Sequence, residues 1–278
     1  MVKLLNFLRR GLYYALHGVP VQRVEANIHY LSPSSRLKGK RIVVTGGGRG
    51  IGYAMAKRFV EEGAEVLICG RDEKVLEKAS QKIGCKYLQY NLMDIQNTHD
   101  FLLKAEKQLG KIDCLVNNAG VSLHEADFTC VTSETFDIQI NTNLKAPFFL
   151  TQKFVEMLRN DGRLGHVLFI SSETGTTADE RPYGWSKAAI NSMVEGLAYR
   201  LIPFGIRVNA IAPGVVATDM TGLQSDGNLS YAGNIIGRVY LPEEIAEVAC
   251  FLLSEASSCI TGQVLVCNNG KTINARWK

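Results

Sequence analysis

An alternation of short apolar runs with longer amphipathic segments restricts the fold more than any other feature of this sequence. The apolar runs have the length of strands, and they predict strands at residues 41–45, 66–69, 86–90, 114–117, 167–170, 208–211 and 264–266. Helices are predicted after the first three strands, at 50–62, 72–83 and 95–109, and further helical stretches separate the later strands. Strands that alternate with helices form a parallel sheet covered on both faces. The pattern therefore predicts an α/β fold, a single doubly wound domain with a central parallel sheet of about seven strands.

The composition is that of an ordinary soluble globular protein, with 46% hydrophobic and 21% charged residues in 278. Seven cysteines without a C-x-x-C pair fit neither a disulfide framework nor a zinc site, and reduced thiols indicate a cytoplasmic protein. The five histidines form no cluster with ligand spacing, so no metal is expected.

The net charge of +4 is unevenly distributed, because residues 1–41 carry eight Lys or Arg against one Glu. The rest of the chain is mildly acidic, which argues against nucleic acid binding by the main domain. Residues 1–37 are interpreted as a basic extension, with the main domain at 38–278. The extension predicts an amphipathic helix, whose apolar face holds Leu4, Leu5, Leu8, Leu12 and Leu16. Two roles remain open for it: docking on its own protein or a partner subunit, which is favoured, or contact with a membrane surface.

A glycine-rich turn follows the first predicted strand, Thr45-Gly46-Gly47-Gly48-Arg49-Gly50-Ile51-Gly52. Glycines after a strand let the backbone approach a pyrophosphate, and the next helix directs its positive end at that charge. The turn therefore predicts a dinucleotide site. Its spacing is T-G-x-x-x-G-x-G rather than G-x-G-x-x-G.

Tyr183 and Lys187 lie four residues apart in a predicted helix, so both side chains project from one face. An ammonium beside a phenol favours the phenolate, which predicts a lowered pKa for Tyr183. Such a phenol can give a proton to a carbonyl oxygen or take one from an alcohol.

Six motifs in order carry a family resemblance: Thr45–Gly52, Asn117-Asn118-Ala119-Gly120, Asn143, Ser172, Tyr183 with Lys187, and Pro213-Gly214. Over residues 38–270 the chain resembles the short-chain dehydrogenase/reductase family, whose members have a Rossmann-type domain. Within that family, residues 209–214 and 237–246 look most like 3-oxoacyl-carrier-protein reductases, and related sugar and polyol dehydrogenases share them.

The resemblance implies a role for each motif. Ser172 polarises the substrate oxygen, Tyr183 transfers the proton, Lys187 holds the nicotinamide ribose, and Asn143 distorts its helix and completes a proton relay. The residues expected at the cofactor are Gly46, Arg49, Gly50, Ile51, Gly52, Arg71, Asn91, Asn118, Ala119, Gly120, Tyr183, Lys187, Pro213, Gly214, Val216 and Thr218. Residues 219–240 have the composition of a lid over the substrate.

The sequence departs from the family pattern in two places. Ser172 precedes Tyr183 by eleven residues where about thirteen are common, so the connecting loop is short. Cys267-Asn268-Asn269-Gly270 stands where Asp-Gly-Gly is common.

The second predicted strand favours NADP(H) over NAD(H). Folds that prefer NAD place an acid about 20 residues after the glycines, on the ribose 2′-hydroxyl, and here that position is Gly70. Arg71 follows and is expected to bind a 2′-phosphate, with Arg49 in reach of the same group. The competing interpretation is that Asp72 accepts the 2′-hydroxyl.

The sequence therefore predicts an NADP(H)-dependent oxidoreductase that transfers hydride between a nicotinamide and a small carbonyl compound or secondary alcohol. The family resemblance implies a homotetramer or homodimer. One alternative is an extended-type sugar-nucleotide epimerase or dehydratase, which would need a T-G-x-x-G-x-x-G turn and a larger C-terminal domain. The other is a non-catalytic nucleotide-binding scaffold.

Overall fold

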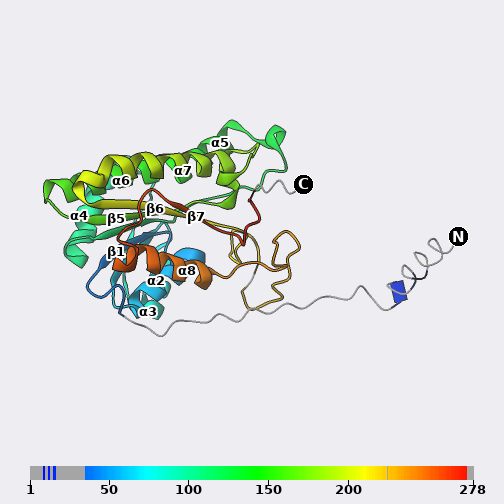
Figure 1. The fold of residues 1–278 in the computed structure, drawn as a ribbon, viewed down its shortest axis with the longest axis horizontal. Coiled ribbons are helices and arrows are strands. Elements are labelled where there is room, and N and C mark those ends of the chain that lie inside the picture. The colour runs from blue at the N-terminus through cyan, green and yellow to red at the C-terminus, as the bar shows by residue number, and fades with distance from the viewer. Residues whose placement is uncertain (1–8, 10–11, 13–14, 17–34, 224, 274–278) are drawn as a thin grey trace.

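A computed structural model describes residues 9, 12, 15–16, 35–223 and 225–273 (Figure 1). Of the predicted N-terminal helix only Arg9, Leu12, Ala15 and Leu16 are described, and these are helical and exposed. The docking and membrane roles considered for this helix fall outside the described residues. No helix in the described ranges combines the length and the apolarity needed to cross a bilayer.

Seven parallel strands form one sheet in the order β3-β2-β1-β4-β5-β6-β7, which confirms the predicted fold class. The strands are β1 Arg41–Thr45, β2 Glu65–Gly70, β3 Lys86–Gln89, β4 Cys114–Asn117, β5 Gly165–Ile170, β6 Ile206–Pro213 and β7 Val264–Cys267. The chain runs outwards from β1 to β3 and then returns to add β4 on the other side of β1. The strand order therefore reverses between β1 and β4, and ligands of open α/β sheets bind at such a point.

Helices cover both faces of the sheet (Figure 1). They are α2 Gly50–Glu61, α3 Glu73–Ile83, α4 Thr98–Leu109, α5 Ser133–Ile140, α6 Ala146–Asn160, α7 Pro182–Leu201 and α8 Pro242–Leu253. The helices α5, α6 and α7 lie above the sheet in the figure, and α2, α3 and α8 lie below it. The predicted helices at 50–62 and 72–83 are confirmed to within a residue. The helix predicted at 95–109 begins with a separate 3₁₀ turn, Ile95–Asn97.

Two apolar cores lie on the two faces of the sheet, and the strands alternate between them. In β1, Ile42 and Val44 pack into the core of α2, α3 and α8, while Val43 packs into the core of α4, α6 and α7. All three side chains are fully buried. Burial on both faces explains why the strands read as continuous apolar runs rather than as alternating ones.

The segment before β1 already belongs to the packed domain. Leu37 is fully buried, and its amide donates to the carbonyl oxygen of Glu62 at 3.1 Å. The guanidinium of Arg36 pairs with Glu62 at 2.7 Å and with Glu247 on α8 at 3.0 Å. The last residues of the predicted extension 1–37 are thus fixed to α2 and α8.

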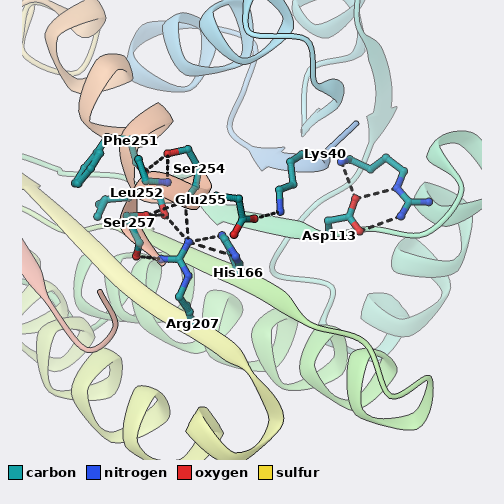
Figure 2. Close-up of polar contacts among 11 residues, drawn as sticks. Lys40, Asp113, His166, Arg207, Phe251, Leu252, Ser254, Glu255 and Ser257 are labelled. Carbon is teal, nitrogen blue, oxygen red and sulfur yellow. Dashed lines mark hydrogen bonds and ion pairs between the residues drawn. The ribbon is translucent and has the colours of Figure 1, made fainter. Parts of the chain in front are cut away.

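The amino ends of the strands carry a polar cluster around Arg207 on β6 (Figure 2). Its guanidinium donates to four carbonyl oxygens at 3.0–3.2 Å, those of Leu252, Ser254, Ser257 and Ile260. These carbonyls lie at and beyond the end of α8, so Arg207 satisfies a helix terminus that would otherwise lack donors. One guanidinium nitrogen also lies 2.9 Å from Nδ1 of His166 on β5.

His166 makes the stability of the fold depend on pH. Burial, and then the charges of Arg207 and Lys40, lower the pKa of His166 from 6.5 to about 4, against an opposing contribution from Glu255. In the unfolded chain His166 takes up a proton below pH 6.5, whereas in the folded chain it does so only near pH 4. We therefore expect the free energy of unfolding to fall as the pH falls from 6.5 to 4, by up to about 3 kcal/mol.

Urea unfolding at several pH values measures this loss of stability. His166→Asn removes the titrating group, so its free energy of unfolding should fall less over that interval than that of the wild type. His99→Asn is the control, because His99 is exposed. Equal pH dependence in wild type and His166→Asn would contradict the assignment.

Candidate active site

The candidate site lies at the carboxyl ends of the strands, opposite the Arg207 cluster. The glycine turn follows β1, Asn118 follows β4, Ser172 follows β5 and Gly214 follows β6. Because all the strands are parallel, these segments share one edge of the sheet.

The glycine turn has a backbone that other residues would not adopt. Gly46 and Gly50 have φ of 65° and 55°, in the left-handed region. A Cβ on Gly52 would lie 2.3 Å from the carbonyl oxygen of Gly46, so the turn and the start of α2 touch backbone to backbone. The Asn118 amide nitrogen Nδ2 donates to the carbonyl oxygens of Thr45 (2.8 Å) and Gly46 (3.2 Å) and braces the turn against β4.

The residues present at the start of α2 fit a pyrophosphate. Arg49 occupies the N-cap position without a side-chain capping bond. The first amides of α2, including those of Ile51 and Gly52, therefore have no acceptor from an N-cap side chain. Free amides and a helix dipole favour an anion at this end of the helix.

The segment 118–120 joins the glycine turn to the predicted catalytic residues. Thr45 Oγ1 accepts hydrogen bonds from the amides of Asn118 and Ala119, each at 3.0 Å. A Cβ on Gly120 would lie 3.3 Å from Asn143 Oδ1 and 3.6 Å from Lys187 Nζ. Both side chains thus lie close to Gly120.

The hydroxyl of Ser172 lies beside the phenol of Tyr183. Burial raises the pKa of the Tyr183 phenol, and the neighbouring Ser172 hydroxyl lowers it by less. The hydroxyl oxygen of Ser172 also accepts from the amide of Thr174 at 3.2 Å. Ser171 faces α7 instead and donates to Asn191 Oδ1 at 2.6 Å. Of the serine pair, Ser172 is therefore the one beside the tyrosine.

The short loop between Ser172 and Tyr183 closes by packing tightly onto α7. Asp179 Oδ1 accepts from both the amide and Nε of Arg181 at 3.1 Å. A Cβ on Gly184 would lie 2.3 Å from the Asp179 Cβ, so only glycine leaves room for this approach. The loop is shorter than in the family pattern, but Ser172 still lies beside Tyr183.

Lys187 is 5% exposed, and its ammonium donates to the carbonyl oxygen of Ile170 at 2.8 Å. It lies 5.6 Å from the centre of the Tyr183 ring. Burial lowers the pKa of Lys187 from 10.5 to about 8.

The prediction that Lys187 lowers the pKa of Tyr183 is wrong for this structure. Burial raises the pKa of the phenol above its usual value, and the charge of Asp179 adds to the rise. Desolvation disfavours the phenolate more than the neighbouring Ser172 hydroxyl favours it. The side chains share one helix face as predicted, but the ammonium bonds the Ile170 carbonyl.

Asn143 lies in a π-helical turn, Asn141–Lys145, between α5 and α6. Its side chain is 2% exposed and is bound to the backbone of Val121, accepting from the amide and donating to the carbonyl oxygen, each at 2.8 Å. It also donates to Ser186 Oγ at 3.3 Å. The helix distortion implied by the resemblance is therefore present at this residue.

The residues predicted at the adenosine end lie around the amino end of α3. Asp72 is the N-cap of α3, and its carboxylate accepts from the amide of Val75 at 3.1 Å. Arg71 is exposed beside it. A Cβ on Gly70 would meet only Leu76, at 3.6 Å, which is ordinary contact. The side chain of Asn91 accepts from the amide of Met93 in its own loop.

The segment after β6 runs from the predicted nicotinamide motif to the glycine turn. The amide of Gly214 donates to the carbonyl oxygen of Cys267 at 3.0 Å, and Val216 bridges to Tyr240. The side chain of Thr218 lies 3.3 Å from where a Cβ on Gly50 would be. The lid predicted at 219–240 belongs to this segment, which has a small buried core of Ala217, Leu229, Val239 and Leu241.

Comparisons with known proteins find relatives that match most of this chain. A family model described as enoyl-(acyl carrier protein) reductase matches residues 46–272. The 3-oxoacyl-[acyl-carrier-protein] reductase of Chlamydia muridarum is 37% identical over 248 residues, which cover 85% of this chain and 99% of the relative. The L-rhamnose 1-dehydrogenase (NADP(+)) of Thermoplasma acidophilum is 33% identical over 250 residues, which cover 85% and 98%.

A solved structure has the same fold. The 3-ketoacyl-(acyl-carrier-protein) reductase of Brucella melitensis, complexed with NADH, superposes with a TM-score of 0.79 at 29% identity, covering 85% of this chain and 100% of that one. The matching family model, the sequence relatives and this structure agree on one assignment. The chain belongs to the short-chain dehydrogenase/reductase family of nicotinamide-dependent oxidoreductases.

Proposed function

We propose that this enzyme is an NADP(H)-dependent oxidoreductase that transfers hydride between the nicotinamide and a carbonyl compound or secondary alcohol. The observation that carries the proposal is the grouping of four side chains, with the Ser172 hydroxyl beside the Tyr183 phenol, and with Lys187 and Asn143 both close to Gly120. The relatives bear the names of reductases and dehydrogenases, which favours hydride transfer over epimerisation or dehydration and contradicts the non-catalytic scaffold.

The roles of the four side chains follow from their surroundings. A nicotinamide cofactor, when bound, would supply the hydride transfer. Tyr183 holds the proton at its phenol oxygen, and a raised pKa keeps it protonated at neutral pH, in the form that donates to a carbonyl oxygen. Ser172 donates to the same substrate oxygen.

Lys187 and Asn143 act one step further from the substrate. With a pKa of about 8, Lys187 carries its charge at neutral pH, and we assign to it a bond to a ribose hydroxyl of the cofactor. Asn143 is bonded to the backbone of Val121 and holds the chain next to Gly120 in place. We assign to it the proton relay that passes by Lys187.

A screen for cofactor depletion tests the proposal. Acyl thioesters, ketoses and steroid ketones are each supplied with NADPH and with NADH, and absorbance at the nicotinamide band is followed. We expect turnover of at least one class. The absence of turnover with every carbonyl class, and with the corresponding alcohols and oxidised cofactors, would show that the proposed activity is wrong.

We also propose that the domain at 38–278 forms a homotetramer or homodimer through its long helices, in a cytoplasm that keeps the thiols reduced. All seven cysteines are free, which supports a reducing compartment. A hollow of about 470 Å³ lies over the outer faces of α6 and α7, lined in part by the exposed rings of Phe148 and Phe204. Sedimentation at micromolar concentration should show an oligomer, and a monomer would contradict this part of the proposal.

A further inference from the structure

The residue after Ser172 carries a carboxylate that belongs to none of the predicted motifs. Glu173 is 7% exposed and begins the 3₁₀ turn Glu173–Thr176. One of its oxygens lies 2.7 Å from Lys271 Nζ, and the other accepts from Asn268 Nδ2 at 3.0 Å. Both partners belong to the turn that follows β7.

That turn is itself fixed in place. Asn268 is 1% exposed, and its Oδ1 accepts from the amide of Gly270 at 3.1 Å. The amide of Lys271 donates back to the carbonyl oxygen of Asn268 at 3.2 Å. The carboxylate of Glu173 is therefore held by a defined loop.

The same turn packs against the predicted nicotinamide motif. A Cβ on Gly214 would lie 3.2 Å from the Asn268 Cβ and 2.7 Å from the ring of Tyr240. Tyr240 is 4% exposed. Glu173 thus connects the carboxyl ends of β5, β6 and β7. Ser172 follows β5, and Gly214 follows β6.

The opposite side of the Ser172 turn is clamped by α7. Asn191 Nδ2 donates to the carbonyl oxygen of Gly175 at 3.0 Å, and Ser171 donates to Asn191 Oδ1. Glu173 supplies the only ionic contact of this turn among the described residues. Two directional bonds to a single carboxylate fix the turn more narrowly than apolar packing of the same volume would.

Burying this ion pair has a desolvation cost, so it is weak evidence for stability. Its effect is geometric, since it fixes the peptide that carries Ser172. We propose that Glu173, held by Lys271 and Asn268, is a positioning residue that keeps Ser172 at the Tyr183 phenol. The inference rests on the proposed role of Ser172, and it connects the two departures from the family pattern, the short loop and the Asn268 turn.

Glu173→Gln and Lys271→Met test the inference. Each removes the ion pair while nearly keeping the shape of its side chain. We expect kcat to fall about 10- to 100-fold in both, because small misplacements of a catalytic group cost rates of this order. Cofactor Kd should stay within about twofold, since neither Glu173 nor Lys271 is among the residues expected at the cofactor. The double variant should lose little more than either single one, and Lys271→Arg should restore most of kcat.

A matched control lies at the amino ends of the strands, away from the candidate site. There Lys40 and Glu255 also form an ion pair at 2.7 Å, next to the Arg207 cluster (Figure 2). Glu255→Gln should leave kcat unchanged. Amide exchange of residues 172–176 gives a readout that needs no substrate, and we expect faster exchange in Glu173→Gln and Lys271→Met but not in Glu255→Gln.

Ser172→Ala separates this inference from the proposed function. If Ser172→Ala loses activity while Glu173→Gln and Lys271→Met keep kcat within twofold of wild type, the positioning role is wrong and the function stands. If Ser172→Ala keeps full activity, the proposed role of the serine fails and this inference fails with it. If Glu173→Gln does not fold, the partly exposed Lys271 carries the same test.

Discussion

Tyr183→Phe is expected to lower kcat by at least about 100-fold while cofactor binding persists. The phenol oxygen is the proposed proton donor beside the Ser172 hydroxyl, and phenylalanine removes that oxygen and keeps the ring. Loss of a positioned proton donor costs about 10²–10⁴-fold in rate. Turnover is followed on a substrate found by the carbonyl screen, and cofactor Kd is measured by fluorescence.

The same helix offers a matched control. Tyr199 lies on α7 and is 83% exposed, so Tyr199→Phe makes the same chemical change away from the site. We expect its kcat and Kd to equal those of the wild type. A Tyr183→Phe enzyme that keeps more than about a tenth of wild-type activity would show that another group transfers the proton.

The sheet could be predicted from the sequence because each strand is a continuous apolar run. Ile42, Val43 and Val44 are buried on both faces, so their composition alone marks a strand within a covered parallel sheet. The glycine turn could be predicted too, since a Cβ on Gly52 would meet the backbone of Gly46. Such local steric requirements determine the residue type at a position, so they can be recognised from the sequence.

Features that depend on distant segments could not be predicted. The pKa of Tyr183 rises because the fold buries the phenol, and residue spacing carries no information on burial. The contact of Glu173 with Lys271 joins residues that are 98 positions apart. In the sequence, Arg207 only interrupts an apolar strand. Its role depends on the end of α8, whose carbonyl oxygens it binds in the folded protein.

Arg71→Ala is expected to lower kcat/KM for NADP(H) about 10- to 100-fold and to leave kcat/KM for NAD(H) nearly unchanged. A hydrogen bond to a charged group contributes about 1.5–3 kcal/mol, and only NADP(H) carries the 2′-phosphate that Arg71 would bind. The wild-type enzyme should accordingly prefer NADP(H). Arg200→Ala, which removes an exposed guanidinium at the far end of α7, should change neither value.

The structure supports this expectation through Asp72. Its carboxylate caps α3 by accepting from the amide of Val75, so it is already engaged in a bond that stabilises the helix. Gly70 places no side chain next to it, and the guanidinium of Arg49 lies on the neighbouring turn, 3.5 Å from Asp219 in an exposed ion pair. An exposed pair of this kind is worth little, so a phosphate can displace Asp219 from Arg49 at small cost.

Asp72→Ser separates phosphate recognition by Arg71 from the competing interpretation, that Asp72 binds the ribose 2′-hydroxyl. Serine also caps helices, so α3 keeps its N-cap while the carboxylate is lost. If Arg71 reads the phosphate, Asp72→Ser should leave the ratio of kcat/KM for the two cofactors within about twofold of wild type, whereas Arg71→Ala shifts it towards NAD(H). A wild-type preference for NAD(H) that disappears in Asp72→Ser would instead assign the ribose contact to Asp72. An unchanged ratio in Arg71→Ala would show that the cationic side chain of Arg71 takes no part in choosing the cofactor.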